Sequence, residues 1–171
     1  MGMMRLREAI IVGAALLCGA MTPPVLAANK AVNMSLTVVI NAAPPCTITG
    51  GTVEFGDVLT TKVNGENYLQ TVGYSLSCSG RLSDFLKLQI QGNAIVVNGE
   101  SVLQTDVPGL GIRLQTASDK TLIAPGSSAW LPFQYTGSNG PEIQAIPVKN
   151  NGVTLTGGAF NAGATLVVDY Q

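Results

Sequence analysis

The chain has 171 residues, of which only 11% are charged against roughly 25% in ordinary soluble domains, and its formal net charge is −1. This length suits one domain with a sizeable core. Histidine is absent, which removes the commonest general base and excludes Ser-His and Cys-His nucleophile pairs. No basic run points to nucleic acid, so we expect neither an enzyme nor a nucleic-acid-binding protein, and no cofactor.

Residues 1–27 are predicted to be a secretory signal peptide that is removed. Arg5 and Arg7 precede an apolar run from Ala9 to Ala20, and Val25-Leu26-Ala27 ends the segment, with cleavage expected after Ala27. The run is shorter than the roughly 20 residues that a membrane-spanning helix needs. We therefore expect an exported protein.

Cys46 and Cys78 are the two cysteines that remain after cleavage. Export passes the chain through an oxidising compartment, where pairing is the expected state. Two sulfurs without histidine rarely hold zinc, so no metal site is expected. Cys78 also shares one face of a predicted strand with Tyr74 and Leu76, which places the disulfide on the core side of a sheet.

An alternating segment precedes the first of these cysteines. In an extended strand its apolar residues share one face and leave polar residues opposite. Burying this apolar row would contribute on the order of 10 kcal/mol of stabilising free energy, and the burial requires a groove that can receive the row. The row consists of Val32, Met34, Leu36, Val38 and Ile40.

The body of the chain contains many short strand candidates separated by turn residues. Asn98-Gly99 and Asn151-Gly152 have strand-like flanks and are predicted to close two hairpins, the second joining Val148 to Val153–Leu155. No convincing helical period follows the signal, which favours an antiparallel sandwich of immunoglobulin-like size. The other strand candidates are Tyr68–Cys78, Phe85–Gln91, Leu110–Thr116 and Ala129–Tyr135.

Two features suggest ligand chemistry but have simpler interpretations. Trp130 could stack on a sugar ring, yet a lone tryptophan in an apolar strand is more often core, and we favour the core. Glu100 with Asp106 could supply paired acids for glycoside chemistry, but charges at turn edges are the favoured interpretation.

The sequence closes on a second alternating strand from Ala162 to Tyr170. Ala164, Leu166, Val168 and Tyr170 share one face. The free edge of this strand must pair with an earlier segment or with another chain.

These features together resemble a pilin subunit of the chaperone-usher family of Gram-negative bacteria. The resemblance rests on the alternating arm, on Pro44-Pro45-Cys46-Thr47-Ile48 at the start of the body, and on Val53-Glu54-Phe55-Gly56 soon after. Its most specific part is the C-terminal signature, a glycine fourteenth from the end and an aromatic penultimate residue. Here these residues are Gly158 and Tyr170, with Gln171 last.

The resemblance implies an all-β, incomplete immunoglobulin-like antiparallel sandwich with an N-terminal donor-strand extension. Residues 28–45 would form the donor arm and residues 46–171 the pilin domain. An apolar groove would lie beside the C-terminal strand, where a periplasmic pilus chaperone lends a strand and holds the carboxylate of Gln171. The chaperone and acceptor edge would comprise Gly158, Ala164, Leu166, Val168, Tyr170 and Gln171.

Polymerisation would follow at an outer-membrane usher, where the arm of a neighbouring fimbrial subunit replaces the chaperone strand. Head-to-tail contacts that do not close generate a filament. The expected function is therefore a structural subunit, of minor or adaptor type, in a cell-surface fimbrium that contributes to adhesion.

Some alternatives stay open. Family arms commonly carry a glycine in the alternating row, and none occurs here between Asn29 and Thr49, which leaves docking register and neighbour undecided. A receptor-binding tip adhesin and a self-complete secreted sandwich that acts as a binding module are the rival functions. In an isolated chain, we expect the arm either loose or folded into its own groove.

Overall fold

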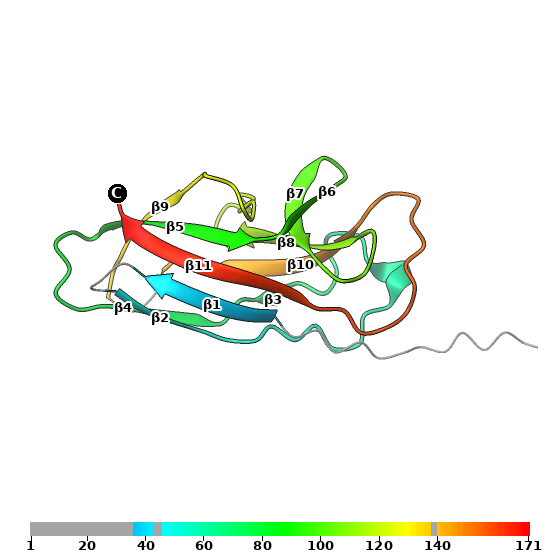
Figure 1. Ribbon diagram of the computed structural model, residues 1–171, viewed down its shortest axis with the longest axis horizontal. Coiled ribbons are helices and arrows are strands. Elements are labelled where there is room, and N and C mark those ends of the chain that lie inside the picture. The colour runs from blue at the N-terminus through cyan, green and yellow to red at the C-terminus, as the bar shows by residue number, and fades with distance from the viewer. Residues whose placement is uncertain (1–35, 43–45, 138–139) are drawn as a thin grey trace, which may run out of the picture.

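The computed structural model describes residues 36–42, 46–137 and 140–171, with only the backbone described for 36–42. This part of the chain forms eleven β-strands and one 3-10 turn, Thr60–Lys62, with no α-helix (Figure 1). The predicted all-β class is therefore confirmed. The strands are β1 Leu36–Ala42, β2 Cys46–Gly50, β3 Gln70–Thr71, β4 Tyr74–Cys78, β5 Phe85–Gly92, β6 Ala94–Val97, β7 Glu100–Gln104, β8 Leu110–Thr116, β9 Leu131–Gln134, β10 Ile143–Lys149 and β11 Ala162–Tyr170.

Two sheets pack face to face around one main core. The first has the order β1-β11-β5-β9 and the second β3-β10-β8-β7-β6, while β2 and β4 form a two-stranded ladder. Alternate residues of β5 and β11 meet alternate residues of β8 and β10, as sandwich packing requires. The fully buried centre includes Leu88, Val168, Ile112 and Ala145.

The hairpin predicted at Asn98-Gly99 is confirmed. Asn98 and Gly99 have φ angles of 51° and 89°, the positive values that a two-residue hairpin turn of this kind needs. The turn is tied to the end of β10, because Asn98 Nδ2 donates to the Lys149 carbonyl at 2.9 Å and the Asn151 amide donates to Asn98 Oδ1 at 2.9 Å. The hairpin tip is thus fixed against the second sheet.

Cys46 and Cys78 form the predicted disulfide and are register partners in β2 and β4. Both are buried, which confirms the core-side placement. Tyr135 lies against the same strand: its hydroxyl accepts from the Cys78 amide at 3.4 Å and donates to the Gly137 carbonyl at 2.7 Å. At this end of the sandwich, the disulfide and the hydrogen bonds of the Tyr135 hydroxyl hold the strands together.

Three local predictions are wrong. The strand expected over Tyr68–Cys78 is interrupted at Val72-Gly73, so that β3 joins the second sheet while β4 pairs with β2. Asn151-Gly152 does form a turn, but Val153–Leu155 does not continue as a strand. Trp130 is half-buried rather than core, with the Lys87 ammonium 4.9 Å from its ring centre.

Candidate functional site

β11 is an interior strand of the first sheet and has a partner strand on each side. On one side it pairs antiparallel with β5, from Ala164 opposite Gly92 to Tyr170 opposite Leu86. On the other side it pairs parallel with β1. Within the described chain, β11 would be an edge strand if β1 were absent, and an unpaired strand edge is a template for another strand.

The β1–β11 pair is the one parallel ladder among the strands that the structure describes. β1 lies in the chain before β2, and it also runs beside β2, so it fills the space between β11 and the β2–β4 ladder (Figure 1). A parallel neighbour needs a long connection, and here that connection is nearly the whole domain. The segment at the start of the described chain therefore completes the sheet at its last strand.

The inward face of β11 is apolar, as the sequence alternation predicts. Ala164, Leu166 and Val168 are buried, whereas Tyr170 is half-buried at the end of the strand. These side chains extend the sandwich core to the edge where β1 lies.

A small apolar cavity lies directly beneath this part of β11. No polar surface lines it, so the space favours an apolar side chain over water. Burial raises the pKa of the Tyr74 phenol in its wall, whose hydroxyl donates to the Pro141 carbonyl. The lining residues are Val72, Tyr74, Ile90, Leu114, Ile143, Ala164 and Leu166.

The register between β1 and β11 pairs the residues of the predicted apolar row with inward-facing residues of β11. Leu36, Val38 and Ile40 are the partners of Ala162, Ala164 and Leu166, which are three of the four buried residues of β11. The row predicted from alternation is thus in phase with the inward face of β11. Val32 and Met34, the first two residues of that row, lie outside the described residues, as does the predicted signal peptide.

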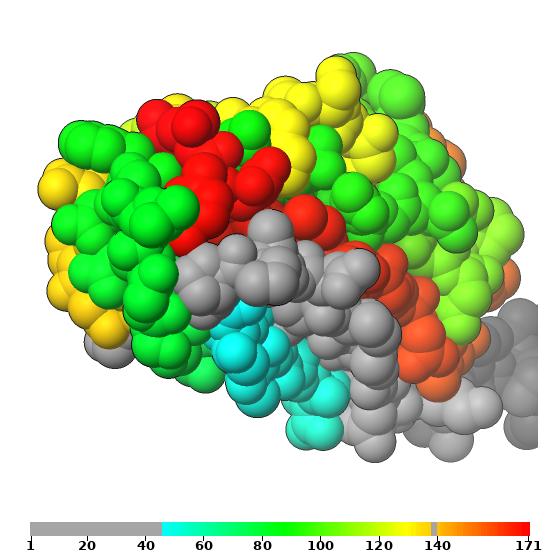
Figure 2. All heavy atoms as spheres, turned by 60° about the vertical axis from the view of Figure 1, so that its left-hand side comes forward, coloured from blue at the N-terminus to red at the C-terminus, as the bar shows by residue number. Residues whose placement is uncertain are grey.

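The end of β11 is bonded to β5 and the loop before it. The Tyr170 hydroxyl accepts from the Leu82 amide at 3.4 Å, and Gln171 Nε2 donates to the Leu86 carbonyl at 2.8 Å. Figure 2 shows the last residues, in red, at the surface beside green atoms of the segment that leads into β5. Of the predicted acceptor residues, Tyr170 therefore lies on the same strand as Leu166 and Val168, and Gln171 follows directly after that strand.

Gly158 is the predicted acceptor residue that the structure places apart. It lies in the loop before β11, half-buried beside Phe160 and Val107, and its φ angle is 155°. A Cβ at this position would meet nothing within 4 Å, so backbone conformation rather than space favours glycine. Gly158 shapes the entry to β11 rather than its edge.

Sequence reasoning missed the cavity wall contributed by the second sheet. Ile143 lies in β10, of which the sequence predicted only the end at Val148. Nothing in the sequence indicated that Leu114 faces the C-terminal strand. Among the described residues no group of three or more metal-ligating side chains gathers, and no helix there is long and apolar enough to cross a membrane. The paired edge of β11 and the apolar cavity beneath it are suited to pairing strands.

Comparison with known proteins agrees with this geometry. A family model described as fimbrial protein matches residues 32–171. The chain is 42% identical over 165 residues to the fimbrial-like protein YfcR of Escherichia coli strain K12, covering 96% of each. Among solved structures it is similar to the P pilus adaptor subunit PapF, at 25% identity and a TM-score of 0.52 over 75% of this chain and 97% of that one. The P pilus rod subunit PapA shares the fold, with 23% identity and a TM-score of 0.53 over 74% of this chain and 99% of that one. The chain therefore belongs to the fimbrial protein family.

Proposed function

We propose that this fimbrial subunit polymerises by donor-strand exchange. Residues 28–45 act as the donor arm, and the edge of β11 that β1 occupies is the acceptor. The observation that carries the proposal is the register match between β1 and the buried residues of β11. A strand that can fill this edge within one molecule has the alternation needed to fill the same edge in another copy or in a related subunit.

The connection between arm and body favours release of the arm. Only residues 43–45 separate the end of β1 at Ala42 from the start of β2 at Cys46. A change of direction in this short link frees β1 without breaking the β2–β4 ladder or the disulfide. Exchange of an identical element between copies costs little, because the strand pairing that is broken inside each molecule forms again between molecules.

We propose that the same edge of β11 also binds the other partners of the subunit. A periplasmic pilus chaperone lends a strand to β11 before assembly, and Tyr170 and Gln171 lie where that strand would end. An outer-membrane usher then exchanges the chaperone for the arm of a neighbouring subunit, and the fibre is displayed at the cell surface, where it contributes to adhesion. These roles rest on family membership and on the edge that β11 would present if β1 were displaced.

Deletion of Asn29 to Asn41 tests the donor role. The truncated subunit should still be recovered with its chaperone, because β11 is intact, but it should not be added to a neighbour through its arm. The readout is the ladder of heat-sensitive oligomers on gels of periplasmic extracts mixed with a full-length subunit. A ladder in which the truncated protein still acts as donor would contradict the proposal.

The acceptor end has its own test. Tyr170→Ser combined with removal of Gln171 should abolish recovery of the chaperone complex, because it removes the aromatic anchor and the bonds that hold this end of β11 to β5 and to the loop before it. Thr165→Ser, a half-buried β11 position outside the apolar row, is the matched control. Equal recovery of both variants would count against the acceptor assignment.

A self-complete sandwich is the second candidate, and the intramolecular β1–β11 pairing favours it. The two candidates differ in how β1 opens. Donor-strand exchange requires β1 to detach while the body stays folded, whereas a self-complete fold loses β1 only on global unfolding. Hydrogen exchange of the β1 amides in mild denaturant separates them: sub-global opening supports exchange, and opening at the global rate supports the self-complete fold.

A further inference from the structure

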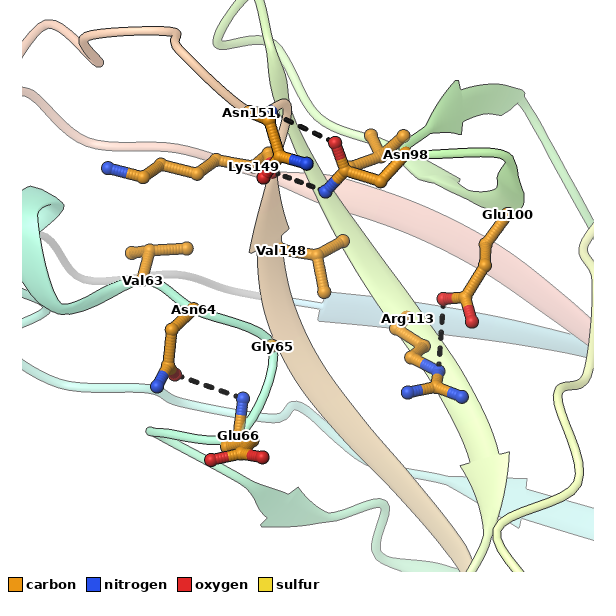
Figure 3. Close-up of a pocket in the computed structure, with 11 residues that line it drawn as sticks. Val63, Asn64, Gly65, Glu66, Asn98, Glu100, Arg113, Val148, Lys149 and Asn151 are labelled. Carbon is orange, nitrogen blue, oxygen red and sulfur yellow. Dashed lines mark hydrogen bonds and ion pairs between the residues drawn. The ribbon is translucent and has the colours of Figure 1, made fainter.

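A polar cleft lies on the outer face of the second sheet, away from the strand-pairing edge. It sits between the tip of the β6–β7 hairpin, β8, β10 and the turn that follows Lys62 (Figure 3). Its volume is about 500 Å³, within the range of small-molecule sites. Among the side chains that the structure describes, none from β11 lines it, so the cleft is separate from the edge at which β11 pairs with β1.

The floor of the cleft is aliphatic. Val63, Val97 and Val148 are buried there, and Val97 and Val148 belong to a small apolar cluster separate from the main core. Figure 3 shows Val63 and Val148 between the polar residues of the two walls. The floor offers an apolar contact of a few methyl groups.

The rim combines two carboxylates with two cations. Arg113 Nε lies 3.3 Å from a Glu100 carboxylate oxygen, but this contact lacks hydrogen-bond geometry, and Nε has no hydrogen-bond partner within the described residues. Glu66 is exposed on the opposite side, and Lys149 Nζ donates to the Thr60 carbonyl at 3.1 Å. The four formal charges cancel, so the cleft disfavours a strongly charged ligand of either sign.

The walls are held in place before any ligand arrives. Asn98 is bonded to Lys149 and Asn151 as described above, and Asn64 Oδ1 accepts from the amides of Glu66 at 3.1 Å and Asn67 at 2.9 Å. A site that is already ordered loses little conformational freedom on binding.

We propose that this cleft binds a neutral saccharide. Sugar hydroxyls both donate and accept, which matches carboxylate acceptors and guanidinium donors placed around one site. The aliphatic face of a sugar ring matches the valine floor. An added peptide strand is disfavoured because the main chains here are already paired, with Arg113 opposite Ile146 and Val97 opposite Glu100.

The test is a titration of the isotope-labelled full chain, monitored by amide chemical shifts. The probes are the methyl glycosides of glucose, galactose, mannose and N-acetylglucosamine, with sialyllactose and an uncharged hexapeptide as comparisons. We expect saturable shifts at Gly65, Asn98 and Val148 with at least one neutral glycoside. Glu66→Ala should weaken that binding about tenfold, since a hydrogen bond to a charged group is lost. Glu54→Ala, an exposed glutamate outside the cleft, should leave it unchanged.

Other outcomes overturn the proposal. One is the absence of shifts with every neutral glycoside at about 50 mM, a concentration well above the dissociation constants of ordinary recognition. The others are shifts confined to other surfaces, and binding of sialyllactose or the hexapeptide alone. The titration does not require polymerisation, so its failure is distinguishable from failure of donor-strand exchange.

Discussion

Ile40 in β1 and Leu166 in β11 are register partners in parallel strands, although they lie near opposite ends of the described chain. Sequence alternation puts Ile40 in the apolar row and Asn41 outside it. We expect Ile40→Asp to release the arm, because its partner in the register is the buried, apolar Leu166 and a carboxylate is costly in apolar surroundings. Limited proteolysis followed by mass spectrometry should show faster cleavage before Cys46, and Asn41→Asp is the matched control. Equal cleavage rates in the two variants would refute the role of the register.

Leu166 should contribute strongly to stability because its side chain is buried and lines the cavity beneath β11. Leu166→Ala is expected to lower the free energy of unfolding by about 2 to 5 kcal/mol, since it enlarges an existing space. Urea denaturation of the full chain measures the change. Thr165→Ala, on the half-buried face of the same strand, should cost far less, and a comparable loss would show that strand propensity rather than packing is responsible.

The Cys46–Cys78 disulfide closes a loop with a sequence separation of 32. Replacing both cysteines by alanine should lower the free energy of unfolding by roughly 3.5 to 4 kcal/mol in the chain-entropy model. Reduction of the unmodified protein should give a similar shift in the denaturation midpoint. If the double variant and the oxidised protein unfold at the same midpoint, the bond does not stabilise the fold.

The lowered pKa of the Asp119 carboxyl predicts that the free energy of unfolding falls at acid pH. Hydrogen bonds from the hydroxyls of Thr116 and Thr121 lower its pKa from 3.8 to about 2. A lowered native pKa means that the unfolded chain takes up the proton first, so this stabilisation is complete above about pH 4 and is lost as pH falls toward 2. Denaturation of the protein and of Asp119→Asn between pH 2 and 5 should therefore give curves that converge at low pH. Parallel curves across this range would contradict the assignment.

The sequence predicted the elements whose signals are local. The β6–β7 hairpin followed from Asn98-Gly99, because two positive φ angles suit few other dipeptides. β5 and β8 were found from their strand-like composition, and the inward face of β11 from its strict alternation. The disulfide followed from export and an even cysteine count.

The elements that were missed, or predicted only at one end as β10 was at Val148, depend on contacts from distant parts of the chain. β10 contains Pro147, which argues against a central strand, but β3 pairs only with Gln144 and Ala145, so no ladder bond on that side is lost at the proline. Both faces of β10 are buried because the β6–β7 hairpin covers Val148 on the outside, and this hides the alternation. The polar cleft was missed for the same reason, since Glu66, Glu100 and Arg113 come from separate segments.

The position of β11 between β5 and β1 also affects how the protein folds. β11 is the last described strand in chain order, yet it is an interior strand of its sheet. β1 and β5 both precede in the chain the strand that joins them, so the edges that they present to β11 stay unpaired until β11 docks between them. The β1–β11 ladder spans nearly the whole described sequence, and such distant contacts form slowly. The early strands are therefore exposed to aggregation for longest, and a factor that shields them at this stage would increase the yield of folded protein.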